Sequence, residues 1–225
     1  MRLRYVCALS VCFVALAALA VAAPQEVSVE EFGADLEQWV GAVNDFIGDV
    51  RFDEADMQSF LDHFGEFSAM MDDESAEGGE EDYSEENWDE VEEPSMSESF
   101  QELLALVEDG QYLAWAAGNG LDAEDWMRKS ARILLLSQST AMTEFFAMAE
   151  AQMQEQAGSL EEQREQMGEE MYEAMQASFK MMEMTREAWA ELPAPTAAEE
   201  QLIADHMDEI SQLIGMDEGD EWGAP

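Results

Sequence analysis

Apolar residues recur at steps of three and four positions along most of the chain, which is the spacing of one face of an α-helix. One such series lies within residues 28–47 and a second within residues 53–71. The first comprises Val29, Phe32, Leu36, Trp39, Val43 and Phe46, and the second comprises Met57, Phe60, Leu61, Phe64, Phe67 and Met71. No stretch shows the sustained period of two expected of a half-buried strand. The pattern predicts an all-α protein, a helical bundle that opens with an antiparallel helical hairpin because the first two helices are joined by a short connection.

Several helix starts are marked by a Ser or Thr that stands three positions before a Glu. In such a capping box the two side chains satisfy backbone N–H groups of the first turn. The pairs are Ser28 with Glu31, Ser95 with Glu98, Ser159 with Glu162 and Thr196 with Glu199, and Asp53 and Asp122 are candidate caps at two further starts. Together with Gly and Pro stops they predict helices near residues 95–110, 123–156, 160–191 and 196–215. A short amphipathic piece is expected around Tyr112 and Trp115. The two long helices either fold back or extend into a coiled coil, and the sequence leaves both arrangements open.

The helical pattern is broken by an acidic segment at residues 72–94. Thirteen of residues 72–93 are Asp or Glu and none is basic. Such a segment buries too little apolar surface to fold alone, so it is predicted to be a disordered linker. The predicted organisation is therefore a signal peptide at 1–22, a helical hairpin at 23–71, the linker at 72–94, a C-terminal helical bundle at 95–215 and an acidic tail at 216–225.

The first residues have the pattern of a cleavable secretory signal. Arg2 and Arg4 precede an uncharged apolar run, and small residues end it at Ala22, where we expect cleavage. The alternative, an uncleaved membrane anchor, calls for about 20 apolar residues, and this run is short for that. Both cysteines, Cys7 and Cys12, lie inside the predicted signal. The mature chain would then be periplasmic or extracellular, without stable membrane insertion, disulfides, cysteine nucleophiles or cysteine-ligated metals.

The chain has 53 acidic residues against nine Lys and Arg, which gives a formal net charge of -44. Nucleic acid and anionic lipid are bound through basic side chains, so both are excluded as expected targets. Two explanations of the acidity remain open. It could be a solvated surface suited to salty surroundings, or a surface that holds a cationic partner such as divalent ions or a basic protein.

Methionines are concentrated in the second half of the chain, where nine lie between Met142 and Met184. Met167, Met171 and Met175 repeat every four residues. Thioethers bind Cu(I), so these three residues form a candidate metal site. The same spacing also produces an ordinary apolar seam between packed helices. A third interpretation is a flexible methionine-rich surface that contacts other proteins, with Met182 and Trp189 as candidate contact residues.

The two histidines share the pattern Asp-His-x-x-Glu, at His63 with Glu66 and at His206 with Glu209. A His and a Glu three positions apart lie on one helix face, and two such helices could bind zinc or another divalent ion. However, His206 falls on the apolar stripe of its helix, where a hydrogen-bonded core histidine is the usual explanation.

Three basic residues, Arg128, Lys129 and Arg132, stand within five positions. They could grip an anionic group or clamp the acidic linker. The favoured interpretation is that these three residues form ion pairs with carboxylates of the same chain, because the chain has many more acidic than basic residues.

No Gly-x-Ser-x-Gly elbow and no glycine-rich phosphate loop is present, and the mature chain has no cysteine. The sequence therefore favours a non-enzymatic exported protein that binds an unidentified protein or peptide partner, without a cofactor. A metal-binding protein that uses the methionine cluster or the His–Glu pairs is the alternative, and an enzyme comes third. A homo-oligomer is compatible with the pattern.

Overall fold

The computed structural model describes residues 28–77 and 95–215, and every element within them is a helix. The helices are α2 (Val29–Ile47), α3 (Glu54–Glu77), α4 (Met96–Leu106), α5 (Gly110–Gly118), α6 (Ala123–Met167), α7 (Glu169–Ala190) and α8 (Ala197–Leu213). The prediction of an all-α fold is confirmed. The predicted signal peptide, residues 78–94 of the predicted linker and the tail from residue 216 lie outside the described part. None of the described helices has the combination of length and apolar character needed to cross a membrane.

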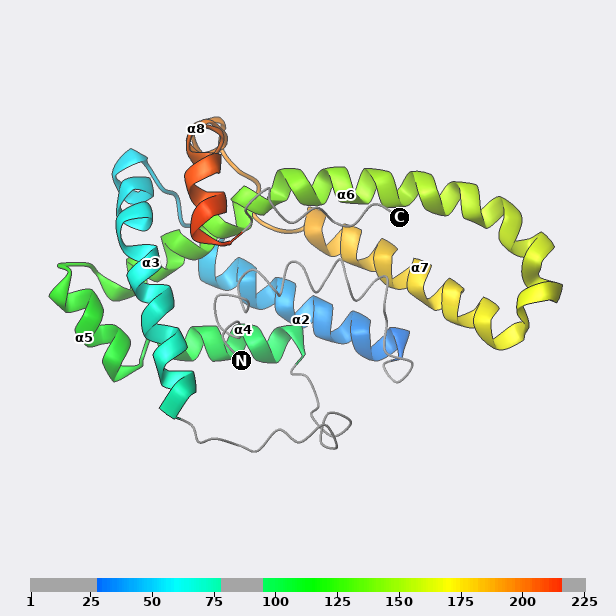
Figure 1. Ribbon diagram of the computed structural model, residues 1–225, viewed down its shortest axis with the longest axis horizontal. Helices are drawn as coiled ribbons and strands as arrows, with labels where there is room; N and C mark the ends of the chain where they lie inside the picture. The colour runs from blue at the N-terminus through cyan, green and yellow to red at the C-terminus, as the bar shows by residue number, and fades with distance from the viewer. Residues whose placement is uncertain (1–27, 78–94, 216–225) are drawn as a thin grey trace.

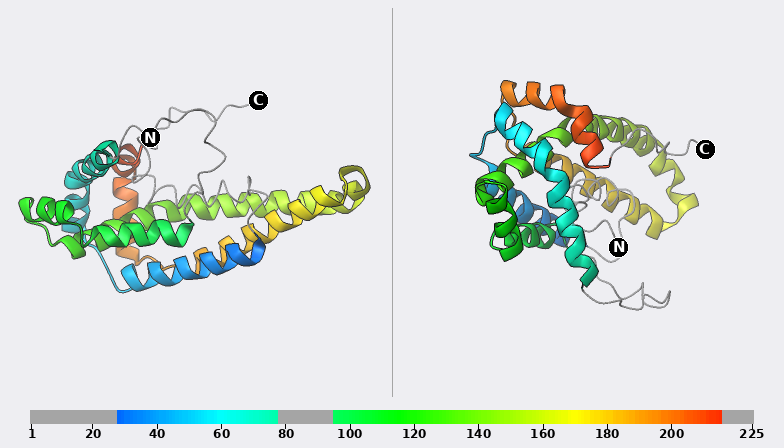
Figure 2. Two further views of the ribbon diagram at one scale, coloured as in Figure 1. Left: turned by 90° about the horizontal axis from the view of Figure 1, so that it is seen from below. Right: turned by 60° about the vertical axis from the view of Figure 1, so that its left-hand side comes forward.

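Most of the helices form a body, and part of α6 and α7 extends from it (Figure 1). The two long helices fold back on each other, which settles the alternative that the sequence leaves open. We call residues 139–182 the arm. It comprises the C-terminal part of α6, which follows a run of consecutive buried residues, and the first part of α7. Figure 2 shows the arm reaching beyond the body in a second view.

One hydrophobic core unites the body. Its fully buried members include Trp39 of α2, Phe60 of α3, Tyr112 of α5, Leu134 of α6 and Ile210 of α8. Residues on both sides of the acidic segment therefore pack into the same core. Burial of apolar area on this scale is the main favourable term in the stability of the fold.

The predicted hairpin of the first two helices is not found. Helix α2 packs mainly against α4 and α7, whereas α3 packs against α8 and α6. Figure 1 shows α2 and α3 running in clearly different directions. The physical reason lies in their connection, where Val50 and Phe52 are buried in the core. Because these two side chains are buried, the connection is held against the core and does not form a simple hairpin loop. The apolar face of α2 is covered instead by α4 and α7, which are distant in sequence.

The helix starts are largely those that the capping residues predict. Ser28, Ser95 and Thr196 each form a capping box with their Glu, and Asp53 and Asp122 accept first-turn N–H groups. The start predicted at Ser159 is wrong, because α6 continues unbroken to Met167. The chain turns instead at Gly168, whose φ of 86° is a conformation that favours glycine. A Ser and a Glu three apart are also neighbours on the surface of a continuous helix, so the motif alone does not fix a start.

Helix α3 ends later than predicted. It extends to Glu77, six residues into the segment predicted to be a linker. Met71 is the last residue of α3 that is described as buried, and it joins the core. A helix that is already nucleated propagates at low cost into adjacent residues, which explains the extra turn and a half.

Asp35 of α2 fixes the start of α4 across more than sixty residues of sequence. Its carboxylate accepts hydrogen bonds from the backbone N–H of Met96 at 3.0 Å, from that of Ser97 at 3.2 Å and from the Ser97 hydroxyl. A carboxylate at a helix N-terminus satisfies free N–H donors and interacts favourably with the helix dipole. The contact determines where the chain rejoins the body after the acidic segment.

Replacement of Asp35 by Asn should lower the free energy of unfolding by about 1 kcal/mol, because Asn carries no charge and its amide group offers only one acceptor oxygen. Urea unfolding followed by circular dichroism would measure the change. Asp45→Asn, at an exposed site on the same helix, is the matched control and should change the value by only a few tenths of that amount. Equal effects of the two variants would contradict a specific role for Asp35.

Candidate functional site

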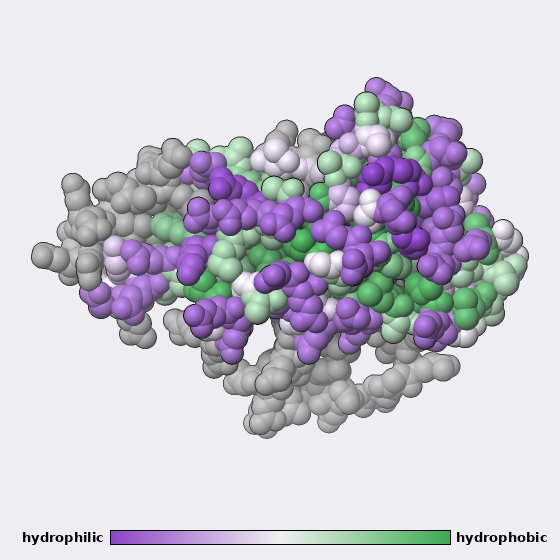
Figure 3. Space-filling model, turned by 180° about the vertical axis from the view of Figure 1, so that it is seen from behind, coloured by the Kyte–Doolittle hydropathy of each residue, from purple (hydrophilic) through white to green (hydrophobic). Residues whose placement is uncertain are grey.

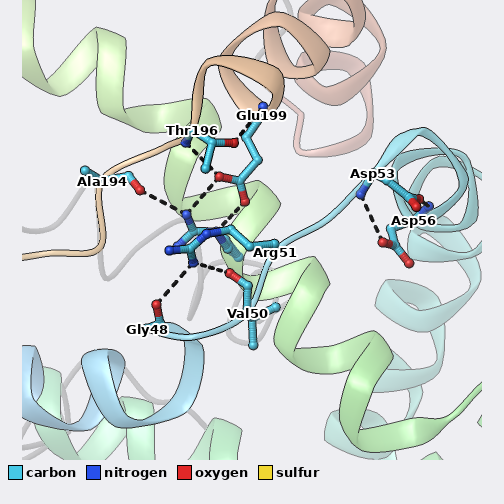
Figure 4. A network of polar contacts seen from close by, with 9 residues as sticks. Gly48, Val50, Arg51, Asp53, Asp56, Ala194, Thr196 and Glu199 are labelled. Atoms are coloured by element: carbon cyan, nitrogen blue, oxygen red, sulfur yellow. Dashed lines mark hydrogen bonds and ion pairs between the residues drawn. The ribbon is translucent and has the colours of Figure 1, made fainter.

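Among the described residues, the most deeply buried ion pair joins the N-terminal part of α6 to the first turn of α8. Arg132 and Glu199 have exposed side-chain fractions of 0% and 1%. The Arg132 Nε atom donates to Glu199 Oε1 at 2.7 Å, and Nη2 donates to Oε2 and to the carbonyl of Ala194, each at 3.0 Å. Glu199 also accepts from the backbone N–H of Thr196 at 2.8 Å. Figure 4 shows Ala194, Thr196 and Glu199 turned toward this network.

Glu199 is ionised in this environment. Burial by itself would raise the pKa of its carboxyl group, but the hydrogen bonds from Arg132 and Thr196 outweigh burial and lower the pKa to about 2. The Glu199 residue predicted as a helix cap therefore has a second role, which the sequence does not reveal. It supplies the counter-charge for a fully buried arginine.

Arg51, Arg128, Lys129 and Arg132 gather where α2 ends and where α3 and α8 begin, and we call them the basic junction. Arg128 donates to the carbonyl of Phe46 and pairs with Asp49, both at 2.6 Å. Lys129 pairs with Asp56 at 2.9 Å and with Asp125 at 2.7 Å. Arg51 donates to the carbonyls of Gly48 and Val50. Figure 4 shows Arg51 beside these two residues.

These contacts confirm the interpretation of Arg128, Lys129 and Arg132 as charge pairing within the protein. Their carboxylate partners come from four parts of the chain, namely the α2–α3 connection and helices α3, α6 and α8. The junction uses its basic groups to hold helix ends together. Since the basic side chains of the junction are used in these ion pairs and hydrogen bonds, the junction has a structural role.

The two His–Glu pairs do not form one metal site. Within residues 28–77 and 95–215, no group of three or more His, Cys, Asp or Glu side chains is arranged to hold a metal ion. His206 lies between Glu209 at 3.1 Å and Glu54 of α3 at 3.4 Å, and hydrogen bonding to Glu209 raises its pKa. His63 instead lies edge-on to Trp115, with ring centroids 6.3 Å apart, and Glu66 is exposed.

The candidate methionine ligands have different surroundings. Met171 is 57% exposed and Met175 is half-buried, while the side chain of Met167 lies outside the described residues. The candidate contact residues Met182 and Trp189 are engaged inside the protein. Met182 is 8% exposed and packs with Ala149 between α6 and α7, and Trp189 packs against the main core.

Met148 is not among the candidate residues predicted from the sequence, although it is 66% exposed, more than any other large apolar side chain whose exposure is described. The exposure of Met148 could have been predicted from its position relative to the apolar residues of α6. The buried residues Met142, Phe146 and Ala149 define one face, and Met148 follows Phe146 by two positions, which places it about 200° around the helix. Met148 therefore projects away from the seam with α7.

Contacts between described residues of α6 and α7 hold the arm together. Ala149 and Met182 form an apolar cluster separate from the main core. Gln176 donates to the Tyr172 hydroxyl at 2.8 Å within α7, and Arg186, just outside the arm, approaches Glu150 of the arm at 3.5 Å. Met148 and Met171 lie outside this seam and face solvent. On the face seen in Figure 3, hydrophilic residues cover much of the described surface and apolar areas lie between them.

No protein-family model matches the chain, and no curated protein and no solved structure matches it significantly. The function must therefore be inferred from the geometry and charge of the chain itself.

Replacement of Glu199 by Gln should lower the free energy of unfolding by about 3 to 5 kcal/mol, because the buried Arg132 loses its counter-charge. Urea unfolding at neutral pH would measure this loss. Glu200→Gln, one position along on the exposed side of α8, is the matched control and should leave the midpoint almost unchanged. A small effect of Glu199→Gln would show that the buried pair does not anchor α8.

The effect of Glu199→Gln on the free energy of unfolding should depend on pH. The pKa of Glu199 falls from 4.5 to about 2 on folding, so its ionised form contributes stability that is complete above about pH 5 and is lost as the pH falls toward 2. The difference in unfolding free energy between the wild type and Glu199→Gln should therefore shrink over that window. A difference that does not change with pH would contradict the assignment.

Proposed function

We propose that this protein is exported and works by binding another protein, and that the arm provides the contact surface. The observation that carries the proposal is the exposure of Met148 at 66% and Met171 at 57%, both on the arm. Burial of a methionine side chain stabilises a contact by about 1.5 to 3 kcal/mol, so each exposed residue is a substantial source of binding energy.

Methionine suits a contact surface that meets irregular or varied partners. Its unbranched thioether side chain has three rotatable bonds and adapts to the shape that it meets. The basic junction, by contrast, is committed to holding helices together. This contrast supports the arm as the surface on which a partner docks.

The charge of the arm supports a basic partner. The arm carries nine acidic residues against Arg164 and Lys180, and the whole chain has a net charge of -44. A surface of this kind repels acidic proteins and accelerates association with basic ones. The partner that fits both properties is a basic amphipathic helix, whose apolar face covers the methionines while its Lys or Arg residues face the carboxylates.

A designed peptide of about 20 residues, long enough to form a helix, would test the proposal. It should consist of Leu and Lys with Leu at helical spacing, and isothermal titration should show binding that weakens as salt is added. The double variant Met148→Gln, Met171→Gln should bind at least about tenfold more weakly, which corresponds to a loss of about 1.4 kcal/mol.

Two controls make the test specific. A peptide of the same composition with scattered Leu residues should bind poorly, because it has no apolar face. Leu113→Gln removes an exposed apolar side chain from α5, away from the arm, and should leave the affinity unchanged. Equal binding of both peptides, or equal loss in the Leu113 variant, would refute the arm as the contact surface.

Export can be tested separately. Protein recovered from the exported fraction of expressing cells should begin at Ala23 when its N-terminus is determined by mass spectrometry. Ala22→Arg places a large charged residue at the cleavage site and should leave the signal attached. Recovery of the intact chain with Met1 from the exported fraction would argue against cleavage.

A further inference from the structure

The described methionines differ sharply in their access to solvent. Seven of them are buried in the described structure, namely Met57, Met71, Met96, Met127, Met142, Met181 and Met182. Met148 and Met171 are 66% and 57% exposed. Among these described methionines, a reagent that attacks thioether sulfur in the folded protein therefore reaches Met148 and Met171 most easily.

We propose that Met148 and Met171 are oxidation sites whose conversion to methionine sulfoxide switches off binding by the arm. The oxidant is a hydroperoxide such as hydrogen peroxide. The thioether sulfur attacks one peroxide oxygen and forms the S–O bond, the O–O bond breaks, and the second oxygen leaves as water after it takes up a proton. Sulfur loses two electrons and the peroxide gains them.

The composition of the chain favours methionine as the target. Thiolates are the protein groups that most readily react with peroxide, but the only cysteines are Cys7 and Cys12, which lie in the predicted signal peptide. After cleavage at Ala22 no thiol competes for the oxidant. Among the methionines whose exposure the structure describes, Met148 and Met171 are then the most accessible targets.

The position of the two residues separates binding from folding. A sulfoxide is polar and a strong hydrogen-bond acceptor, so it no longer favours burial against an apolar helix face. Since neither Met148 nor Met171 belongs to the main core or to the Ala149–Met182 cluster, their oxidation leaves the packing of the fold in place. The exposure that admits peroxide also admits a methionine sulfoxide reductase, so the change is reversible.

The first experiment measures selectivity. The purified mature protein is treated with limiting hydrogen peroxide, and proteolytic peptides are analysed by mass spectrometry over time. Met148 and Met171 should gain one oxygen at least about tenfold faster than the fully buried Met57 and Met127. In urea all four should react at similar rates, because the difference arises from folding. Equal rates in the folded protein would overturn the proposal.

The second experiment measures the consequence, and this part rests on the proposed function. The selectively oxidised protein should keep its thermal unfolding midpoint but bind the Leu/Lys peptide at least about tenfold more weakly. A reductase should restore the affinity. The double variant Met148→Leu, Met171→Leu should bind the peptide before peroxide treatment and equally well afterwards, because leucine has no sulfur.

The two possible failures are distinguishable. If the untreated protein does not bind the peptide, the proposed function is wrong, and the proposal that oxidation switches off binding is refuted as well. If the untreated protein binds and the sulfoxide form binds equally well, the contact surface stands and the switch alone is overturned.

Discussion

The buried ion pair between Arg132 and Glu199 is the interaction on which the arrangement of the helices depends. It joins the N-terminal part of α6 to the first turn of α8, with both side chains excluded from solvent. Loss of either partner would strand an unpaired charge in the interior, which is far more costly than the loss of a surface contact. The pair therefore commits α8 to one position, and α8 in turn covers the apolar face of α3.

The basic junction extends the same principle to the other helix ends. A chain with 53 acidic residues has strong self-repulsion, and it places Arg51, Arg128, Lys129 and Arg132 where α2, α3, α6 and α8 meet. Its basic residues thereby neutralise carboxylates and helix-terminal carbonyls at the centre of the body. The surface elsewhere is left strongly acidic. The arm accordingly carries a net negative charge beside its exposed Met148 and Met171.

Much of the local structure could be predicted, because it depends on residues close together in the sequence. The capping boxes at Ser28, Ser95 and Thr196 locate the starts of their helices to within one residue, and the seam from Val29 to Phe46 also spans nearly all of α2. The failures arose where a local signal had two meanings. Ser159 with Glu162 resembles a helix start but lies inside α6, and the turn occurs at Gly168. The candidate contact Met182 lies on a helix face that proved to be covered.

The sequence by itself determined that the chain is helical, acidic and rich in methionine, since composition and a period of 3.6 residues are properties of the chain alone. Only the tertiary structure decided which apolar faces meet. It paired α2 with α4 and α7 where a hairpin with α3 was expected, and it gave Glu199 a buried arginine. Among the methionines whose exposure is described, it also separated seven that are buried from Met148 and Met171, which face solvent. Periodicity defines a face, whereas the partner of that face is set by contacts between residues far apart in sequence.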